Sequence, residues 1–285
     1  MDLWFTECFS QHARFSLRVD RHLFSGRSQF QKIDILETPE FGRVLVIDGF
    51  IMLTERDEFV YHEMIAHVPM AVHPNARRIA VVGGGDGGTV RELAQYPHVE
   101  QIDLVEIDKL VVDVCREYLP CTARGLDDPR VRIHYVDGVE FMRQCRTLYD
   151  LIIVDSTDPI GPGEGLFSRE FYASCFAALA DDGIMVNQHE GAFYADDARA
   201  CQRAHKRIAE VFPIAKVYQA NIPTYASGLW LFGFASKRYD PISGLREAEW
   251  EQYGISTRYY TPRLHKGAFA LPAYVERLLA EARSK

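Results

Sequence analysis

The chain has 285 residues, of which 47% are hydrophobic and 12% aromatic, and its formal net charge is −8. This apolar content excludes an intrinsically disordered protein, because disordered chains have too few apolar residues to form a core. The acidic balance and the lack of any lysine or arginine run argue against nucleic acid as a partner, since such surfaces need clustered positive charge. The length fits one large α/β domain or two unequal domains.

The N-terminal residues contain no targeting signal that we recognise. Asp2, Glu7 and Cys8 interrupt the first apolar stretch, which does not match the charged and then apolar order of a secretory signal. No apolar run approaches the ~20 residues that cross a bilayer. The six cysteines are scattered without a Cys-x-x-Cys pair, which is typical of reduced thiols. We therefore expect a soluble, cytoplasmic protein without membrane contact.

In chain order, the first expected element is a small antiparallel β region. Strand-like alternation fills residues 15–53 and is interrupted by turns that contain glycine and proline. A helix is expected over 57–73, where apolar residues recur mostly at helical spacing. We predict an N-terminal β domain over 1–56 and a larger α/β domain over 57–285.

After residue 73, strands and helices are expected to alternate. The expected strands cover 79–82, 102–105, 131–136, 151–154 and 184–187. The expected helices cover 89–95, 109–118, 139–145, 169–179 and 196–211. Apolar strands separated by helices are typical of a parallel sheet covered on both faces. Two more strands, 215–220 and 229–235, have no helix between them and should pair antiparallel at one edge. The predicted fold is a doubly wound, mostly parallel, seven-stranded α/β sheet of the Rossmann-like type.

A glycine-rich loop, Gly83 to Gly88, follows the first strand of this series and opens a helix. Its glycines permit a tight turn and a close approach of the backbone to a ligand. Glu106 ends the next strand, where an acidic residue accepts hydrogen bonds from ribose hydroxyls. Asp137 and Gly138 follow the third strand, where Asp137 also fits a helix N-cap. Together these features favour nucleoside binding over strand–helix packing alone.

Two ligand classes are disfavoured. Asp86, inside the glycine loop, would repel a pyrophosphate at the helix N-terminus, which argues against NAD. His62 and His67 are five residues apart, whereas a metalloprotease helix needs a spacing of four, so we expect no metal site. A nucleoside attached to a cation, such as a sulfonium, accounts for the acids better than one attached to phosphates.

An acidic motif follows the fourth strand of the series. Asp155 comes directly after the strand, and Asp158 lies three residues later on a segment rich in proline and glycine. This spacing places two carboxylates in one crevice beneath a movable segment, although a turn at Asp158 is an alternative. Other acidic and aromatic side chains suited to an aliphatic diamine are Tyr61, His62, Glu190 and Tyr225.

Ordered motifs along nearly the whole chain resemble the spermidine synthase family of polyamine aminopropyltransferases. These motifs are SQFQ (28–31), VLVIDG (44–49), TERDEF (54–59), YHEM (61–64), GGGDGG (83–88), VEID (105–108), DG (137–138), DSTDPIGP (155–162), IPTY (222–225) and FALP (269–272). The resemblance implies a class I methyltransferase-like fold and transfer of an aminopropyl group from decarboxylated S-adenosylmethionine to putrescine. The products would be spermidine and 5′-methylthioadenosine, the donor would be a co-substrate with no cofactor or metal, and the enzyme would be a homodimer or homotetramer.

The resemblance also implies residue roles. The donor would be held by Gln31, Asp86, Glu106, Asp137, Gly138 and Pro162. The amine would be held by His62, Asp86, Asp155, Asp158, Glu190, Tyr225 and Trp4, and the catalytic residues would be Asp155, Asp158 and Tyr61. Spacing does not assign the proton acceptor between Asp155 and Asp158, because neighbouring carboxylates titrate as a pair. Our hypothesis is that Asp155 accepts the proton, helped by Asp158.

Two other functions stay open from the sequence. The first is a methyltransferase that modifies a small amine with ordinary S-adenosylmethionine, and the second is a catalytically silent nucleoside-binding subunit. The acid in the glycine loop argues against the first, and Asp155, Asp158 and Tyr61 argue against the second. The sequence does not fix whether putrescine, cadaverine, agmatine or spermidine is the preferred acceptor.

Overall fold

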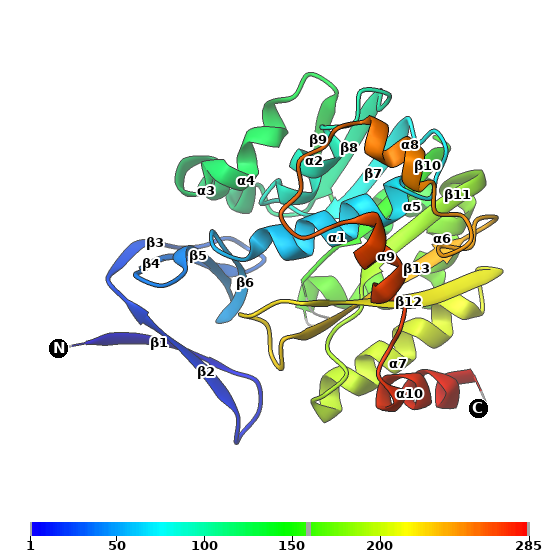
Figure 1. The fold of residues 1–285 in the computed structure, drawn as a ribbon. Helices are drawn as coiled ribbons and strands as arrows, with labels where there is room; N and C mark the ends of the chain where they lie inside the picture. The colour runs from blue at the N-terminus through cyan, green and yellow to red at the C-terminus, as the bar shows by residue number, and fades with distance from the viewer. Residues whose placement is uncertain (1, 158–160, 284–285) are drawn as a thin grey trace.

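The computed structural model describes residues 2–157 and 161–283, and the N-terminal part consists of antiparallel strands. They are β1 (Leu3–Cys8), β2 (Arg14–Val19), β3 (Arg21–Arg27), β4 (Lys32–Thr38), β5 (Gly42–Ile47) and β6 (Phe50–Thr54). β1 and β2 form a hairpin, and β3 to β6 form a four-stranded sheet. Figure 1 shows these strands, in blue, beside the larger part of the molecule. The predicted antiparallel region is confirmed. The strand-like alternation predicted over 15–53 does not include β1, which begins at Leu3. The division into domains over 1–56 and 57–285 stays a prediction.

A seven-stranded sheet forms the centre of the larger part. Its strands are β7 (Arg78–Gly83), β8 (Gln101–Glu106), β9 (Val131–Tyr135), β10 (Tyr149–Asp155), β11 (Leu179–Gln188), β12 (Ile214–Asn221) and β13 (Leu229–Ser236). Their order across the sheet is β12-β13-β11-β10-β7-β8-β9. β7 to β11 pair in parallel, and β13 runs antiparallel to both of its neighbours. The predicted doubly wound fold and its antiparallel edge pair are confirmed.

Helices follow most of these strands. The α-helices are α1 (Glu58–Met70), α2 (Gly88–Leu93), α3 (Lys109–Tyr118), α4 (Pro120–Ala123), α5 (Gly138–Gln144), α6 (Arg169–Ala178), α7 (Ala195–Ala209), α8 (Glu247–Gln252), α9 (Pro262–Ala268) and α10 (Ala273–Arg283). Two 3₁₀ segments are η1 (Arg124–Asp127) and η2 (Gly161–Phe167). The predicted helices are all present, whereas α4, α8, α9, α10 and the two 3₁₀ segments are not predicted. Among the described helices, none has the length and apolar character that a bilayer span requires.

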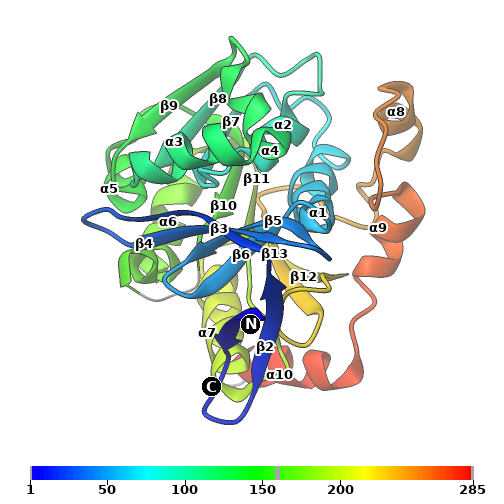
Figure 2. The same ribbon diagram turned by 90° about the vertical axis from the view of Figure 1, so that its left-hand side faces the viewer.

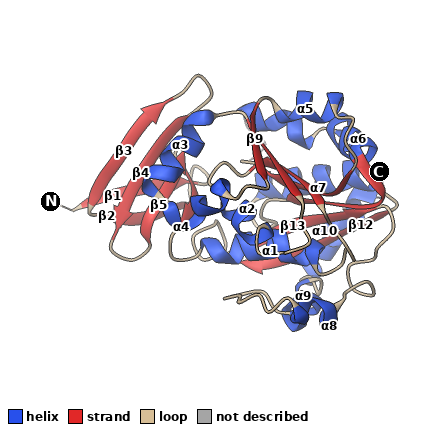
Figure 3. Ribbon diagram, turned by 90° about the horizontal axis from the view of Figure 1, so that it is seen from above, coloured by secondary structure: helices blue, strands red, loops and turns tan. Residues whose placement is uncertain are grey.

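Alternate residues of the central strands pack into two separate cores. Ile79 and Val81 of β7 belong to a core that includes α1, whereas Ala80 and Val82 belong to a core that includes α6. This division follows from the period of two in a strand, which points successive side chains to opposite faces. In Figure 3, α5 and α6 lie on one side of the sheet and α1 lies on the other. The sheet is thus covered on both faces, as its apolar strands predict.

Helix α1 is held in place by the C-terminal segment. The carboxylate of Glu63 accepts hydrogen bonds from the backbone N–H groups of Arg258, Tyr259 and Tyr260, each over 2.7 Å. Figure 2 shows the orange segment that leads from α8 toward α9 near α1. Of the residues of α1, only Phe59 is not fully buried. The orientation of α1 is therefore fixed by contacts with parts of the chain almost 200 residues away.

The chain changes direction across the sheet between β7 and β10. From β7 it passes to β8 and β9 on one side, and it then returns to β10 on the other side of β7. Ligands bind open α/β sheets at the carboxyl ends of the strands beside such a switch point. Gly83, at the end of β7, has a φ of 82°, and a Cβ there would lie 2.1 Å from the carbonyl oxygen of Asp155. Only glycine fits this position, because the two strand ends touch.

Candidate functional site

A cavity of about 360 Å³ opens at this switch point. The predicted site residues that line it are Gln31, Tyr61, His62, Asp86, Glu106, Asp137, Gly138, Asp155, Glu190 and Tyr225. They come from the N-terminal part, from α1, and from the loops and strand ends of the central sheet. Asp158 lies outside the described residues, so its role stays a prediction. Pro162 belongs to η2, and the residue that follows it, Gly163, lines the cavity.

Asp155 is held by two hydroxyl groups. Tyr61, on α1, donates from its hydroxyl to Asp155 Oδ1 over 2.7 Å, and Thr89, on α2, donates from Oγ1 to Oδ2 over 2.7 Å. Burial and the charge of Asp86 raise the pKa of Asp155, although His62 and both hydroxyl donors act in the opposite direction. Asp155 therefore takes up a proton more readily than an exposed aspartate does.

Asp86 has the opposite electrostatic environment. Its Oδ1 accepts a hydrogen bond from the N–H of Gly88 over 2.8 Å and lies 3.2 Å from His62 Nε2. Burial raises the pKa of Asp86, but the charge and hydrogen bond of His62 outweigh it and lower the pKa overall. Two neighbouring acids whose pKa values are driven apart are suited to different tasks. Asp86 stays ionised, and Asp155 is the better proton acceptor.

His62 contacts carboxylates through both ring nitrogens. Its Nδ1 lies 2.6 Å from Glu58 Oε2, and its Nε2 faces Asp86. Burial lowers the pKa of His62, but Asp86 and Glu58 outweigh it and raise the pKa to about 10. The resemblance implies that His62 helps to hold the amine. In this geometry both ring nitrogens of His62 face carboxylates, and its role toward the amine stays a prediction.

His62, Asp86 and Asp155 also form a group of potential metal ligands, with ligand atoms within 4.8 Å of one another. A metal ion needs a neutral imidazole nitrogen, whereas the two carboxylates on His62 favour its protonated form. The donor set therefore fits a proton-bearing ion-pair network better than a metal centre.

The other half of the cavity is lined by Glu106 and Gln31, and both form hydrogen bonds with Asp108. Glu106 Oε1 accepts a hydrogen bond from the N–H of Asp108 over 2.9 Å, and Gln31 Nε2 donates to Asp108 Oδ2 over 3.1 Å. Burial raises the pKa of Glu106 to about 7, although backbone hydrogen bonds from Asp108 and Gly85 act against the increase. The hydrogen bond to Asp108 connects Gln31, in the N-terminal part, to the loop that follows β8. The two segments together close this end of the cavity.

Asp137 caps a helix and lines the cavity. Its Oδ1 accepts a hydrogen bond from the N–H of Val139 over 2.7 Å, which makes it the N-cap of α5. A Cβ on Gly138 would lie 2.4 Å from Val82 Cγ1, so the backbone here packs directly against β7. The N-cap interpretation of the sequence is correct, and it leaves Asp137 in the lining of the cavity.

Aromatic and acidic groups form the end near β11 and β13. The rings of Tyr225 and Trp230 meet edge to face at 4.7 Å, and the Tyr225 hydroxyl donates to the carbonyl oxygen of Met52 over 2.5 Å. Glu190 is buried, has a φ of 68°, and accepts a hydrogen bond from Gln188 Nε2 over 2.8 Å. A left-handed backbone at a residue other than glycine is uncommon and marks a constrained position.

Trp4 does not line this cavity. Its side chain is 56% exposed on β1, and it borders a second cavity against β3 and β4. The hairpin reaches the main cavity at its other end, through Glu7, Cys8 and Phe9. The predicted amine contact of Trp4 is therefore absent from the described geometry. Glu7 is one of the residues that the sequence reasoning missed, although an acid in an apolar N-terminal stretch is a signal that could have found it.

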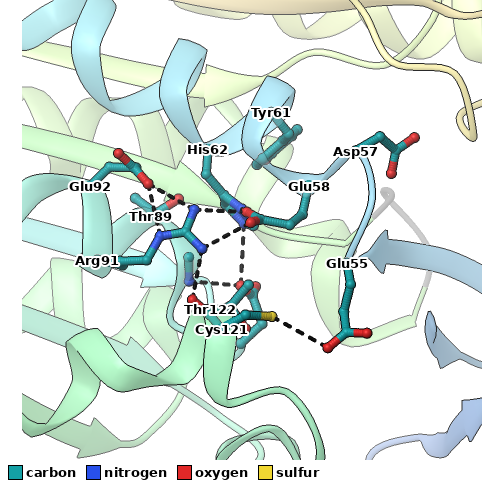
Figure 4. Close-up of polar contacts among 12 residues, drawn as sticks. Glu55, Asp57, Glu58, Tyr61, His62, Thr89, Arg91, Glu92, Cys121 and Thr122 are labelled. Atoms are coloured by element: carbon teal, nitrogen blue, oxygen red, sulfur yellow. Dashed lines mark hydrogen bonds and ion pairs between the residues drawn. The ribbon is translucent and has the colours of Figure 1, made fainter. Parts of the chain in front are cut away.

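Other polar residues at or beside the cavity were also not predicted. They are Glu58, Thr89, Arg91, Asp196 and Asp197. Glu58 and Arg91 contact each other across two helices, as Figure 4 shows. No spacing rule connects residues that far apart in the sequence, so the contact follows from the packing of α1 on α2.

Comparisons with known proteins agree on one family. Residues 58–243 match the family model of the spermine/spermidine synthase domain, and residues 3–55 match that of the spermidine synthase tetramerisation domain. A polyamine aminopropyltransferase of Alkaliphilus oremlandii is 60% identical over 279 residues, which cover 98% of each chain. One of Clostridium perfringens is also 60% identical, with the same coverage.

Two solved structures are similar along nearly their whole length. A spermidine synthase in complex with the transition-state analogue AdoDATO has a TM-score of 0.95 and 42% identity, and the match covers 98% of this chain and 95% of that one. The spermidine synthase of Thermotoga maritima has a TM-score of 0.92 and 40% identity, over 98% and 94% of the two chains. The likeness thus includes the N-terminal strands as well as the central sheet.

Proposed function

The chain belongs to the spermine/spermidine synthase family of polyamine aminopropyltransferases, and we propose that it transfers an aminopropyl group from decarboxylated S-adenosylmethionine to putrescine. The observation that supports this assignment best is the pair Asp86 and Asp155 in one cavity, with the pKa of Asp86 lowered and that of Asp155 raised. This pair offers a fixed negative charge and a proton acceptor side by side, which a cationic donor and a diamine both need.

The difficulty of the reaction lies in the amine. A primary amine with a pKa near ~10.4 is protonated at pH 7, and deprotonating it costs roughly 4.6 kcal/mol. Asp155 accepts one proton from this ammonium group. The neutral nitrogen then attacks the propyl carbon next to the sulfonium, a C–N bond forms, and the C–S bond breaks with its electron pair going to sulfur. The products are spermidine protonated at its new secondary nitrogen, the thioether 5′-methylthioadenosine and a protonated Asp155 carboxyl group.

The residues around Asp155 are arranged for this step. Tyr61 and Thr89 hold both carboxylate oxygens, so the acceptor lone pairs keep one orientation. Fixed orientation of reacting groups lowers the barrier, because less motion is lost in the transition state. We propose that Asp86 attracts the positive charge of the donor, and that Tyr225 and Glu190 contact the amine chain. The roles of Asp158 and Pro162 remain those that the resemblance implies.

The donor half is proposed around Glu106. Its carboxylate, with Gln31 and Asp137 nearby in the cavity lining, would accept hydrogen bonds from the ribose hydroxyls and the adenine. The sulfonium is already an activated leaving group, so we propose the donor as a co-substrate without a further cofactor. Buried free thiols, such as Cys115 and Cys175, support a reduced compartment, and we expect the cytoplasm.

We further propose that the chain forms a homodimer or homotetramer through the N-terminal strands. The match of residues 3–55 to a tetramerisation domain supports this assembly. On β1, Leu3 and Trp4 are each 56% exposed, and large apolar side chains next to each other on a surface are typical of an interface.

Product analysis tests the function. The purified protein would be incubated with decarboxylated S-adenosylmethionine and, in separate reactions, putrescine, cadaverine, agmatine or spermidine, and the products identified by mass. We expect 5′-methylthioadenosine and the amine extended by one aminopropyl group, with putrescine as the preferred acceptor. Formation of adenosylhomocysteine from ordinary S-adenosylmethionine would show a methyltransferase instead. Absence of turnover with every amine would support a silent nucleoside-binding subunit.

A further inference from the structure

Four charged side chains form a continuous chain of contacts behind the cavity. Arg91, on α2, donates from Nη1 and Nη2 to the two carboxylate oxygens of Glu58 over 2.9 and 2.8 Å. Glu58 Oε2 then meets His62 Nδ1, and His62 Nε2 meets Asp86 Oδ1. The charges alternate in sign from Arg91 to Asp86. Figure 4 shows Arg91 between Glu92 and Glu58, with His62 beside Glu58.

Packing fixes this chain of charges at both ends. Arg91 also donates from Nη1 to the carbonyl oxygen of Cys121 over 2.9 Å and from Nε to Glu92 Oε1 over 2.8 Å. At the other end, a Cβ on Gly88 would lie 2.2 Å from Cε1 of His62. The imidazole therefore packs directly on the backbone at the start of α2, and neither cation has room to turn.

Burial makes these charges depend on one another. The side chains of Glu58 and His62 are 5% and 4% exposed, so water screens them little. Burial raises the pKa of Glu58, but the hydrogen bonds and charges of His62 and Arg91 outweigh it and lower the pKa to about 2. With the pKa of His62 raised to about 10, the imidazolium and the Glu58 carboxylate both persist at neutral pH.

We propose that Arg91 and Glu58 are positioning residues that act on the reaction through His62. They hold the imidazolium in place, and the imidazolium keeps the Asp86 carboxylate ionised and oriented beside Asp155. The inference rests on the aminopropyl transfer proposed above. Glu58 has both oxygens occupied by Arg91 and His62, so its effect reaches the substrate through His62.

The groups that face His62 come from three elements. They are Glu58 and Tyr61 on α1, Asp86 in the glycine loop and Asp155 on β10, and Arg91 on α2 acts on His62 through Glu58. Loss of the Glu58 charge removes one of the two anions that hold the imidazole proton, so the pKa of His62 falls. Above that lower pKa, His62 is neutral, and Asp86 and Asp155 repel each other without a cation between them. The cationic donor and the amine then bind beside two carboxylates whose orientation is no longer fixed.

The test is the Glu58→Gln variant, which keeps the shape of the side chain and removes its charge. The first measurement is the titration of His62 by NMR of labelled histidine, which needs no substrate. We expect the pKa of His62 to fall by at least about one unit. The second measurement is kcat/KM for methylthioadenosine formation between pH 6 and 10, taken as the ratio of variant to unmodified protein. We expect this ratio to fall at least about tenfold as pH rises through the new pKa of His62.

Glu100→Gln is the matched control. Glu100 pairs with Arg77 on the surface, where both side chains are about half exposed, so the same substitution breaks an arginine–glutamate pair far from the cavity. We expect it to leave both measurements unchanged. If Glu58→Gln fails to fold because Arg91 loses its partner, the double variant Glu58→Gln with Arg91→Met leaves no unpaired charge in that pair. It should show the same shift in the pKa of His62.

Two results would overturn the inference. One is an unchanged titration of His62 in the folded variants, and the other is a shifted titration with a flat rate ratio across the pH range. A failure of the proposed function is distinguishable from both, because the unmodified protein would then release no methylthioadenosine while its His62 could still be titrated.

Discussion

Tyr61 and Asp155 are 94 residues apart in the sequence, and the hydroxyl of Tyr61 donates to Asp155 Oδ1 over 2.7 Å. The contact joins α1 to the end of β10, so the position of the Asp155 carboxylate depends on a helix that precedes the central sheet in the chain. Burial and the charge of Asp155 raise the pKa of Tyr61 well above 10, which keeps this hydroxyl a donor at every physiological pH.

Tyr61→Phe should therefore shift the acidic limb of the kcat/KM profile to higher pH. The hydroxyl stabilises the ionised form of Asp155, and a hydrogen bond to a charged group contributes about 1.5–3 kcal/mol, which corresponds to roughly one to two pH units. Rates at pH 6 should fall more than rates at pH 9. Tyr172→Phe is the matched control, because Tyr172 is buried and its hydroxyl has no partner within the described chain. An acidic limb that stays in place would refute the role of Tyr61.

Asp155→Asn should remove the proton acceptor and keep most of the shape of the site. We expect the single-turnover rate to fall by about 10²–10⁴-fold, the usual contribution of a general base, with donor affinity largely retained. Asp113→Asn, on the exposed face of α3, is the control and should be fully active. If Asp155→Asn keeps near-normal turnover, another group accepts the proton, and Asp158 is the first candidate.

Asp86 should discriminate between two donors. Ordinary S-adenosylmethionine carries a carboxylate that Asp86 and Asp155 repel, whereas the decarboxylated donor carries only positive charge. By calorimetry we expect the decarboxylated donor to bind at least about tenfold more tightly, and Asp86→Asn to reduce the difference. Equal affinities in the unmodified protein would contradict this account of selectivity.

Binding of methylthioadenosine should depend on pH through Glu106, whose pKa is raised to about 7. Ribose hydroxyls donate to the ionised carboxylate, so affinity should be full above pH 7 and fall as the pH drops below it, by up to roughly tenfold per unit. Calorimetry between pH 5.5 and 8 measures this change. Glu106→Gln should bind more weakly at high pH and show no such slope, and a sloping variant would assign the titration to another group.

Assembly should depend on Leu3 and Trp4. Replacing both by serine removes apolar area from the exposed end of β1, and we expect a smaller species in sedimentation velocity. Leu148→Ser is the control, because Leu148 is similarly exposed, at 54%, but lies outside the N-terminal strands. If the double variant sediments like the unmodified protein, the interface lies elsewhere.

Much of the fold follows from the sequence because each central strand is an apolar run bounded by a helix. The prediction is least complete where the pattern is weak. β11 begins at Leu179, five residues before the expected strand, because Asp181, Asp182 and Gly183 interrupt its apolar pattern. The C-terminal helices are short or amphipathic segments that gain stability by packing on other elements, as α10 does against α7 and α9 against β12.

The residues of the candidate site also fall into a group that the sequence pattern identifies and a group that it does not. The glycine loop, Glu106 and Asp155 stand at strand ends, so position in the pattern identifies them. Thr89, Glu58 and Arg91 are ordinary helix residues whose partners are 33 to 66 positions away. The packing of α1 on α2 brings Glu58 to Arg91, and the position of α2 beside the end of β10 brings Thr89 to Asp155. For Trp4, the resemblance implies an amine contact, but Trp4 does not line the cavity. An aromatic residue near the N-terminus carries no information about which end of a hairpin reaches the cavity.

The hydrogen bonds of Glu63 connect the C-terminal segment to the helix that carries Tyr61 and His62. Three backbone N–H groups between Arg258 and Tyr260 satisfy this buried carboxylate, and Tyr61 and His62 precede it on the same helix. A chain that ended before these residues would leave a buried, unsatisfied carboxylate two residues from Tyr61, at a cost of several kcal/mol. We therefore expect the proposed activity to require a C-terminal segment that, among the described residues, supplies no side chain to the cavity, and we expect an insertion between β13 and α9 to change kcat or KM.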